Sequence, residues 1–343
     1  MDRTGRTCAV TSATTPFINL PFPARQHPES ARIETSTRDW VIRFRLACGD
    51  AGKQGLVQSR FGEAAAYGYP DAPLPEAELA AGWFAWLFFI DDHHEEGAEG
   101  SAQKWTGVTE AVCGVLEQGL PTGPLADTPL IRALADLSHR FDARASPAWK
   151  ERFNRHLMGI MTGGLQDIQL RERGTPLPLA EYIPLRRDAS AVLTCFDVIE
   201  ICGQTELPDQ VYHSSVFQEI VLAGADLFSW INDLYSLDKE IACGIVSNLI
   251  LVLQHERHLS REQAFIAARA LISDRVNDLL AAEERLPELI DTLQLGTAIQ
   301  AAIYRYVAGI RDCIAGSNQW HAHRTHRYQK PLQTADVGGQ PGV

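Results

Sequence analysis

Residues 214–243, SSVFQEIVLAGADLFSWINDLYSLDKEIAC, form a long amphipathic pattern that decides the fold class. Gly244, a residue type that commonly ends helices, follows this stretch directly. Apolar residues recur along it with the period of a helix, at Val216, Ile220, Val221, Leu227, Ile231 and Leu234. The stretch therefore predicts a long helix whose apolar side packs against other helices.

The helical pattern continues through most of the 343 residues. Few segments alternate with the period of two that is typical of strands, and no Asn-Gly or Asp-Gly turn separates β-rich runs. Ser260 and Gln263 have the spacing of a capping box and predict a helix that runs towards Arg285. Further helices are expected at residues 37–48, 55–68, 76–92, 104–119, 127–144, 147–172, 179–202 (interrupted near Pro184 and residues 186–190), 245–257 and 288–318. No internal repeat or clean linker divides them, so we predict one all-α domain.

Both ends of the chain differ from this pattern. Residues 1–30 are polar and proline-rich, which predicts a flexible or extended N-terminal arm. Residues 329–343 contain glycines and prolines without an apolar period, which predicts a loose, disordered C-terminal tail.

The composition excludes several classes of function. The net charge of −12 disfavours binding to a nucleic-acid backbone. The most apolar run, residues 79–90, is too short to span a membrane, and no secretory signal opens the chain. Seven scattered cysteines without a CxxC pair fit a reduced, cytoplasmic setting better than a disulfide framework.

The first acidic cluster is the run of residues 91–96, DDHHEE, at the end of an apolar helix. Asp91 and Glu95 share one helix face, and Asp92 and Glu96 share a neighbouring one. Carboxylates placed this way repel one another, and a hard divalent cation would relieve the repulsion. A solvated helix end is the alternative interpretation. Adjacent histidines point about 100° apart on a helix, so we do not expect the two in this run to bind one ion together.

The second cluster lies on the long helix itself. Asn232, Ser236 and Glu240 follow one another at intervals of four and form one oxygen-bearing stripe. An amide oxygen, a hydroxyl and a carboxylate can together bind Mg²⁺ and still leave places for water and phosphate oxygens. A plain polar face is the alternative, but the apolar stripe before it favours a cavity-facing site.

With these two clusters the sequence resembles the bacterial class I terpene synthases. That family carries an aspartate-rich motif, matched here by residues 91–96, and a motif NDxxSxx(K/R)E on a facing helix. The second motif is matched at Asn232, Asp233, Ser236, Lys239 and Glu240. The resemblance spans roughly residues 30–328 and implies one class I terpene synthase domain at residues 31–328, a single-domain α-helical barrel or bundle.

Two further matches lie outside the motifs. Arg186 stands 46 positions before Asn232, where the family carries a diphosphate-sensing Arg, and Arg327-Tyr328 matches the family's C-terminal Arg-Tyr pair. Three departures are visible. The acidic run lacks a third Asp, so Glu95 or Glu96 must replace it; Cys243 stands where many relatives carry Arg; and residues 188–190 lack the usual Gly.

The resemblance implies a mechanism. Three Mg²⁺ ions would bridge the diphosphate of a linear prenyl diphosphate to the two motifs, and ionisation would yield a carbocation that cyclises. Metal ligands would be Asp91, Asp92, Glu95, Glu96, Asn232, Ser236 and Glu240. Diphosphate donors would be Arg186, Lys239, Arg327 and Tyr328. Aromatic rings attract cations, and the expected pocket residues are Phe61, Phe84, Phe88 and Trp320, with Trp83 and Phe228 as weaker candidates.

Two alternative functions fit parts of the pattern. A prenyl-chain-elongating synthase normally carries a second aspartate-rich motif, which residues 232–240 replace here. A non-catalytic helical protein that binds prenyl diphosphates would not need intact metal ligands and donors. The sequence leaves open the chain length (C15 or C20), the product skeleton, the final deprotonation or water capture, and a possible homodimer.

Overall fold

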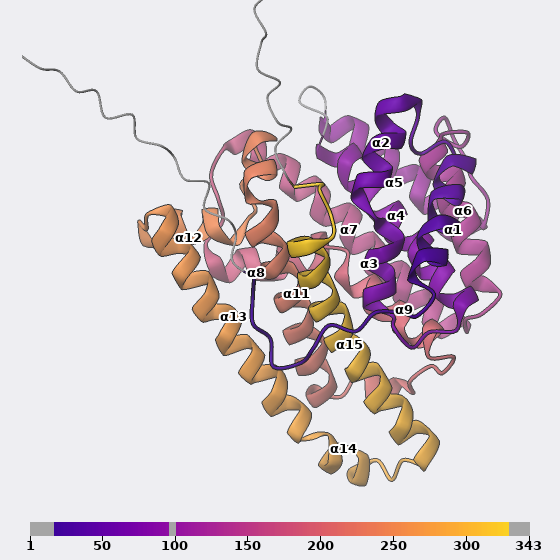
Figure 1. Ribbon diagram of the computed structural model, residues 1–343, viewed down its shortest axis with the longest axis vertical. Helices are drawn as coiled ribbons and strands as arrows, with labels where there is room; N and C mark the ends of the chain where they lie inside the picture. The colour runs from indigo at the N-terminus through magenta and orange to yellow at the C-terminus, as the bar shows by residue number, and fades with distance from the viewer. Residues whose placement is uncertain (1–16, 96–100, 329–343) are drawn as a thin grey trace, which may run out of the picture.

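The computed structural model describes residues 17–95 and 101–328, which form a bundle of α-helices without any strand in those two ranges (Figure 1). This confirms the predicted all-α fold. The helices are α1 (Ser30–Arg43), α2 (Gly49–Ser59), α3 (Phe61–Gly68), α4 (Leu74–Glu95), α5 (Ser101–Gln118), α6 (Pro129–Asp142), α7 (Pro147–Arg173), α8 (Leu179–Ala189), α9 (Val192–Cys202), α10 (Asp209–Tyr212), α11 (Ser215–Ala242), α12 (Leu249–Arg257), α13 (Arg261–Glu284), α14 (Leu286–Thr292) and α15 (Thr297–His323). The tail at residues 329–343 and the start of the arm at residues 1–16 lie outside the described residues.

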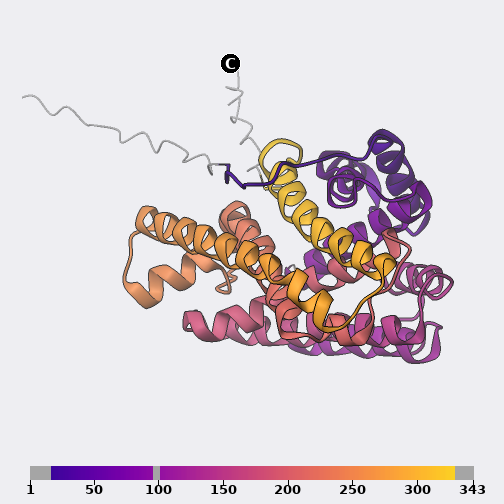
Figure 2. The same ribbon diagram turned by 90° about the horizontal axis from the view of Figure 1, so that it is seen from below.

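The central helices are α4, α11 and α15, and the others support them. Helix α3 packs against both α4 and α15, while α11 packs against α13, α15, α8 and α9. Helices α12 and α13 lie on the side of the molecule away from α1–α6, as both views show (Figures 1 and 2). The predicted long amphipathic helix is present as α11 and buries residues of its apolar stripe, including Ile220, Leu227 and Ile231.

Aromatic packing behind α4 makes one wall of the bundle rigid. Trp83 stacks on Trp86 with ring centroids 5.1 Å apart, and it also contacts Phe153 at 4.9 Å. The indole nitrogen of Trp83 donates a hydrogen bond to the hydroxyl of Thr194 on α9 at 3.1 Å. Large aromatic side chains contribute much of the apolar area in such a core. This packing fixes α4 and, with it, the acidic run at its end.

The predicted interruption within residues 179–202 is present, six residues beyond the proline. Pro184 lies inside α8 without ending it, and the chain breaks at Ser190 and Ala191. Ala191 has a φ of 63°, a left-handed conformation that residues other than glycine seldom adopt. The region expected as one helix at 288–318 is also divided, because α14 ends at Thr292 and α15 starts after Gly296.

The described part of the N-terminal arm, residues 17–29, lies against α15. Figure 2 shows these residues in dark indigo, passing in an extended path beside the C-terminal part of that helix. The amide of Asn318 donates a hydrogen bond to the carbonyl of Ile18 at 2.8 Å. Arg25 binds both carboxylate oxygens of Asp312, at 3.0 and 2.6 Å. Ile18 is also buried, and Phe22 packs against the core, so both apolar burial and these hydrogen bonds hold the arm in place.

The close approach of α15 to α3 at Gly316 gives a prediction about stability. A Cβ at residue 316 would lie 2.8 Å from backbone atoms of Tyr67, whereas one at the exposed Gly55 in α2 would meet no atom within 4 Å. Gly316→Ala is expected to lower the free energy of unfolding by about 1–3 kcal/mol through overpacking. Gly55→Ala should leave it unchanged or raise it by up to about 1 kcal/mol. Urea unfolding measures both, and equal effects of the two substitutions would contradict this account of the packing.

Candidate active site

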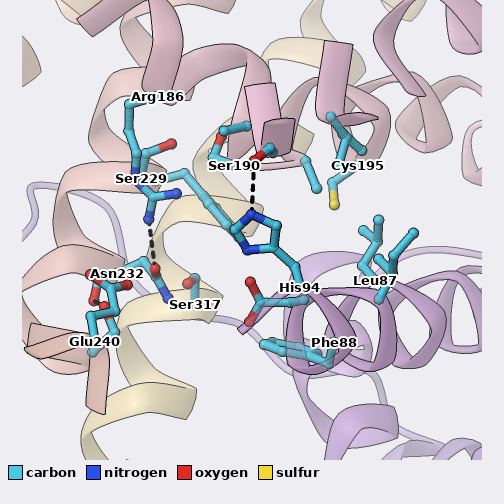
Figure 3. A pocket seen from close by; sticks show the side chains of 18 of the residues that line it. Leu87, Phe88, His94, Arg186, Ser190, Cys195, Ser229, Asn232, Glu240 and Ser317 are labelled. Carbon is cyan, nitrogen blue, oxygen red and sulfur yellow. Dashed lines mark hydrogen bonds between the residues drawn. The ribbon is translucent and has the colours of Figure 1, made fainter. Parts of the chain in front are cut away.

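A cavity lies between the central helices, and the residues of both predicted motifs line it. Side chains from α3, α4, α5, α7, α8, α9, α11 and α15 contribute to its wall. Figure 3 shows the polar residues Arg186, Asn232 and Glu240 on one side and the α4 residues Leu87 and Phe88 on the other. The two clusters predicted from sequence therefore border one space.

The acidic run of α4 stands at the mouth of this cavity. Asp91 lines it with a half-exposed side chain, while Asp92 is turned towards two basic side chains. Arg327 donates to Asp92 at 2.8 Å, and the ammonium of Lys239 lies 3.3 Å from the same carboxylate. Burial alone would raise the pKa of Asp92, but the hydrogen bonds and charge of Arg327, with the charge of Lys239, outweigh it and lower that pKa. Asp92 is thus held ionised.

Two members of the acidic run are not placed by the structure. Glu95 is the last residue of α4, but its side chain is not described, and Glu96 lies outside the described residues. The predictions for both as metal ligands therefore stay predictions.

The polar stripe of α11 faces the cavity as expected. Asn232, Ser236 and Glu240 all line it, and the last two are buried. The amide of Asn248 donates to a carboxylate oxygen of Glu240 at 2.8 Å. Burial, together with the charge of nearby Asp233, raises the pKa of Glu240. A buried carboxylate with a raised pKa is a place where a cation would be strongly favoured.

Arg186 is fixed beside this stripe by a buried ion pair. Its Nε and Nη2 atoms donate to Asp233 at 2.9 and 2.6 Å, and Nη2 also donates to the amide oxygen of Asn232 at 2.9 Å. Asp233 is fully buried and also accepts hydrogen bonds from the Tyr182 hydroxyl and from the backbone N–H of Leu249. The neighbouring Arg187 turns the other way, to Asp226. Arg186 is therefore the arginine of the pair that reaches the cavity.

The Arg327-Tyr328 pair, near the C-terminal end of the described residues, lies beside the acidic run of α4. The Arg327 guanidinium lies 5.0 Å from the centroid of the Phe88 ring, and its buried Nε atom has no hydrogen-bond partner. Tyr328 lines the cavity and stacks on His321 with centroids 5.2 Å apart. The pair thus places one cation and one phenol at the cavity mouth beside the acidic run.

Most of the predicted aromatic residues line the cavity. Phe84, Phe88 and Trp320 do so, and so does the weaker candidate Phe228. Phe61 is not among the lining residues but stacks behind Phe88, with centroids 4.7 Å apart. Trp83 belongs to the aromatic core of the bundle and does not line the cavity either.

Several lining residues were not among the predicted site residues, and His94 of the acidic run is one of them. The Nε2 atom of His94 lies 2.9 Å from the carbonyl of Gly164, so this side chain contacts α7 and does not point to solvent. Asp167, Ser229 and Ser247 line the cavity, and each has a buried side-chain oxygen without a hydrogen-bond partner. No sequence pattern marks these residues, because single polar residues on helices are common. Buried oxygens without a hydrogen-bond partner around a cavity suit a polar or cationic ligand.

His321 is a further residue that sequence reasoning missed. It is buried on α15, and its Nε2 atom lies 3.0 Å from the amide nitrogen of Asn232. Burial, together with the charge of Arg327, lowers the pKa of His321 to about 4. The imidazole is therefore neutral at physiological pH. Its position one residue after Trp320 was the only signal available in the sequence.

Comparison with known proteins agrees with this geometry. Residues 82–278, more than half of the chain, match the family described as "Terpene synthase family 2, C-terminal metal binding". This chain belongs to the terpene synthase family. It is 30% identical over 328 residues to pristinol synthase of Streptomyces pristinaespiralis, covering 95% of this chain and 88% of that protein. It is 31% identical over 301 residues to a Roseiflexus castenholzii enzyme, (+)-T-muurolol synthase ((2E,6E)-farnesyl diphosphate cyclizing), covering 88% of this chain and 90% of that one.

The solved structure of wild-type cucumene synthase matches with a TM-score of 0.78 at 30% identity, covering 88% of this chain and 99% of that chain. The terpene synthase fold is thus confirmed along with the family. The protein is an enzyme of the terpene synthase and cyclase class, and the comparisons favour this over a chain-elongating synthase or a non-catalytic binding protein. The matched family domain is a metal-binding one. Within the described ranges, no helix of this terpene synthase has the length and apolar character needed to cross a membrane.

The buried ion pair of Arg186 gives a second stability prediction. Asp233→Asn removes the charge that pairs with a buried guanidinium, so the free energy of unfolding is expected to fall by about 3–5 kcal/mol. Asp238 on the same helix is the matched control, because it pairs with Arg261 at 2.7 Å with both side chains about half exposed. Asp238→Asn should cost less than about 1 kcal/mol. Thermal and urea unfolding of both variants checks this, and a small effect of Asp233→Asn would show that the pair does not hold α8 to α11.

Proposed function

We propose that this terpene synthase uses Mg²⁺ to ionise farnesyl or geranylgeranyl diphosphate and cyclises the resulting carbocation, with release of diphosphate. One observation carries the proposal: Asp91 at the end of α4 and the oxygen stripe of α11 line the same cavity. Two oxygen-bearing groups on separate helices could then hold metal ions on both sides of one substrate diphosphate. Farnesyl diphosphate is the substrate we favour, because the similar (+)-T-muurolol synthase is named for cyclising it.

The donor atoms fit magnesium. Asp91, Asn232, Ser236 and Glu240 offer carboxylate, amide and hydroxyl oxygens, which hard divalent cations prefer. Burial and the charge of Asp233 raise the pKa of Glu240, so a bound cation would stabilise its ionised form. When bound, the metal ions would neutralise the negative charge that grows on the leaving diphosphate. Three ions are proposed from the family resemblance, with Asp92, Glu95 and Glu96 as further candidate ligands.

The cationic side chains would bind the diphosphate directly. Arg186, Lys239 and Arg327 face the cavity or its mouth, and Tyr328 adds a hydroxyl donor. In this structure Lys239 and Arg327 contact Asp92. Charge-assisted hydrogen bonds from guanidinium to phosphate are strong, so these donors can hold the leaving group as the allylic C–O bond breaks.

The remaining wall would protect the cation. Phe84, Phe88, Phe228 and Trp320 present aromatic rings, each of which attracts a cation by about 0.5–2 kcal/mol. The Arg327-Tyr328 segment at the mouth would exclude water that could quench the cation early. The final product then depends on the contour of this wall. We place the enzyme in the cytosol, because its free cysteines Cys195, Cys202 and Cys313 are buried and unpaired with one another by disulfide.

Two substitutions test the metal ligands. Asp91→Ala and Asn232→Ala are each expected to lower turnover by about 100-fold or more, because loss of metal stabilisation removes several kcal/mol from the transition state. Asp238→Ala removes an exposed acid from the outer side of α11 and serves as the matched control with unchanged turnover. Purified proteins are incubated with geranyl, farnesyl, geranylgeranyl and geranylfarnesyl diphosphate, with and without Mg²⁺, and products are analysed by gas chromatography.

Cyclic hydrocarbons or alcohols that appear only with Mg²⁺ are the expected products. Longer prenyl diphosphates would instead indicate an elongating synthase, and no product from any substrate would indicate a binding protein. Parental turnover by Asn232→Ala would remove that residue from the metal site.

A further inference from the structure

His321 is enclosed between two tyrosine rings at the cavity wall. Its ring stacks on Tyr235 of α11 and on Tyr328, with centroids 5.2 Å apart in both cases and interplanar angles of 22° and 23°. The residue is buried, lines the cavity and projects from α15. Both faces of the imidazole are therefore occupied, and only its edge atoms can make hydrogen bonds.

The edge contacts fix which ring nitrogen carries the proton. Nδ1 lies 2.7 Å from the backbone carbonyl of Ser317, which can only accept a hydrogen bond, so Nδ1 carries the proton. Nε2 of the neutral ring is then an acceptor, and the atom opposite it is the side-chain nitrogen of Asn232 at 3.0 Å. The Asn232 amide therefore donates to His321.

An independent contact fixes the same amide from its other end. Arg186 can only donate, and its Nη2 atom lies 2.9 Å from the Asn232 oxygen. Turning the amide over would set its NH₂ group against the guanidinium and its oxygen against the lone pair of Nε2. The two contacts thus agree on one orientation, with the oxygen directed to the side of Arg186.

We propose that His321 is a positioning residue of the metal site, which holds the Asn232 side chain so that its oxygen, and not its nitrogen, is available to a divalent cation. The inference rests on the proposed function, in which Asn232 is a metal ligand. An amide oxygen has two lone pairs, so it can accept from Arg186 and still bind a metal ion, whereas an amide NH₂ group cannot bind one. His321 would therefore act on metal affinity without contacting the metal.

Three substitutions separate this role from packing. His321→Phe keeps an aromatic ring between the two tyrosines but removes the acceptor. His321→Gln loses the ring but can place its amide oxygen near the former Nε2 position. His321→Asn is shorter, so it can reach the Ser317 carbonyl but not Asn232. His323→Phe, the same change at an exposed position two residues along α15, is the matched control.

Two Mg²⁺ midpoints are measured. The first is the Mg²⁺ concentration that gives half-maximal binding of inorganic diphosphate, determined by titration calorimetry. The second is the Mg²⁺ concentration that gives half-maximal turnover. We expect His321→Phe and His321→Asn to raise both midpoints by about 10-fold or more, the usual effect of losing a partner that orients a metal ligand. His321→Gln should return the midpoints to within about 3-fold of the parent, since a neutral hydrogen bond to an amide is restored. His323→Phe should leave them unchanged.

A role in packing alone would give a different pattern. His321→Phe would then retain the parental midpoints, and His321→Gln would show the larger loss of thermal stability; that result would overturn the inference.

If the parent binds Mg²⁺ and diphosphate with the expected variant pattern but forms no terpene, the proposed function fails and the positioning role stands. If it forms terpene and His321→Phe keeps its Mg²⁺ midpoints, the positioning role alone fails. If the parent shows no Mg²⁺-dependent binding or turnover, both fail.

Discussion

The ion pair between Arg186 and Asp233 fixes the relation of α8 to α11, and the geometry of the site depends on it. Asp233 is fully buried, so its charge is tolerated only because it is saturated with donors. Those donors come from α8 through Arg186 and Tyr182 and from α12 through the N–H of Leu249. Helices α8 and α12 are thereby bound to a carboxylate of α11. As a consequence Arg186 is held against Asn232 and not released to solvent.

The same charges explain how a protein with a net charge of −12 can bind a polyanion. Carboxyl groups lie at Asp91 and Asp92 and, within the α11 stripe, at Glu240, and metal ions would be attracted to these positions. Basic side chains are interleaved with these acids, and Arg327 already lies against Asp92. Bound metal ions and basic side chains together would present positive charge to a diphosphate, while the aromatic wall below remains neutral.

The sequence predicted the fold class and the cavity-facing stripe of the candidate site because both depend on helical periodicity. A spacing of four places Asn232, Ser236 and Glu240 on one face, and the structure has all three on the cavity wall. The likeness to a family then located Arg186 and Arg327, which lie 46 residues before the α11 stripe and near the end of the chain. No local pattern would have placed Arg186 in the cavity wall and Arg327 against Asp92.

The remaining features depend on contacts between distant segments, which composition does not encode. The arm at 17–29 contains Ile18, which is buried, and Arg25, and both of these residues find partners on α15. Phe61 has the residue type of a pocket wall but stacks behind Phe88. His321 acquires its role only because α15 lies beside α11, so that an imidazole meets the Asn232 amide. Each of these required the packing of helices to be known.

Diffraction from crystals grown with Mn²⁺ and inorganic diphosphate tests the central claim most directly. Mn²⁺ takes the same oxygen ligands as Mg²⁺ and can be located by its anomalous scattering. The account predicts anomalous peaks within coordination distance of Asp91 and, separately, of Asn232, Ser236 and Glu240, with one diphosphate between them. Peaks on the protein surface, or at one helix only with no diphosphate bridging the cavity, would contradict it.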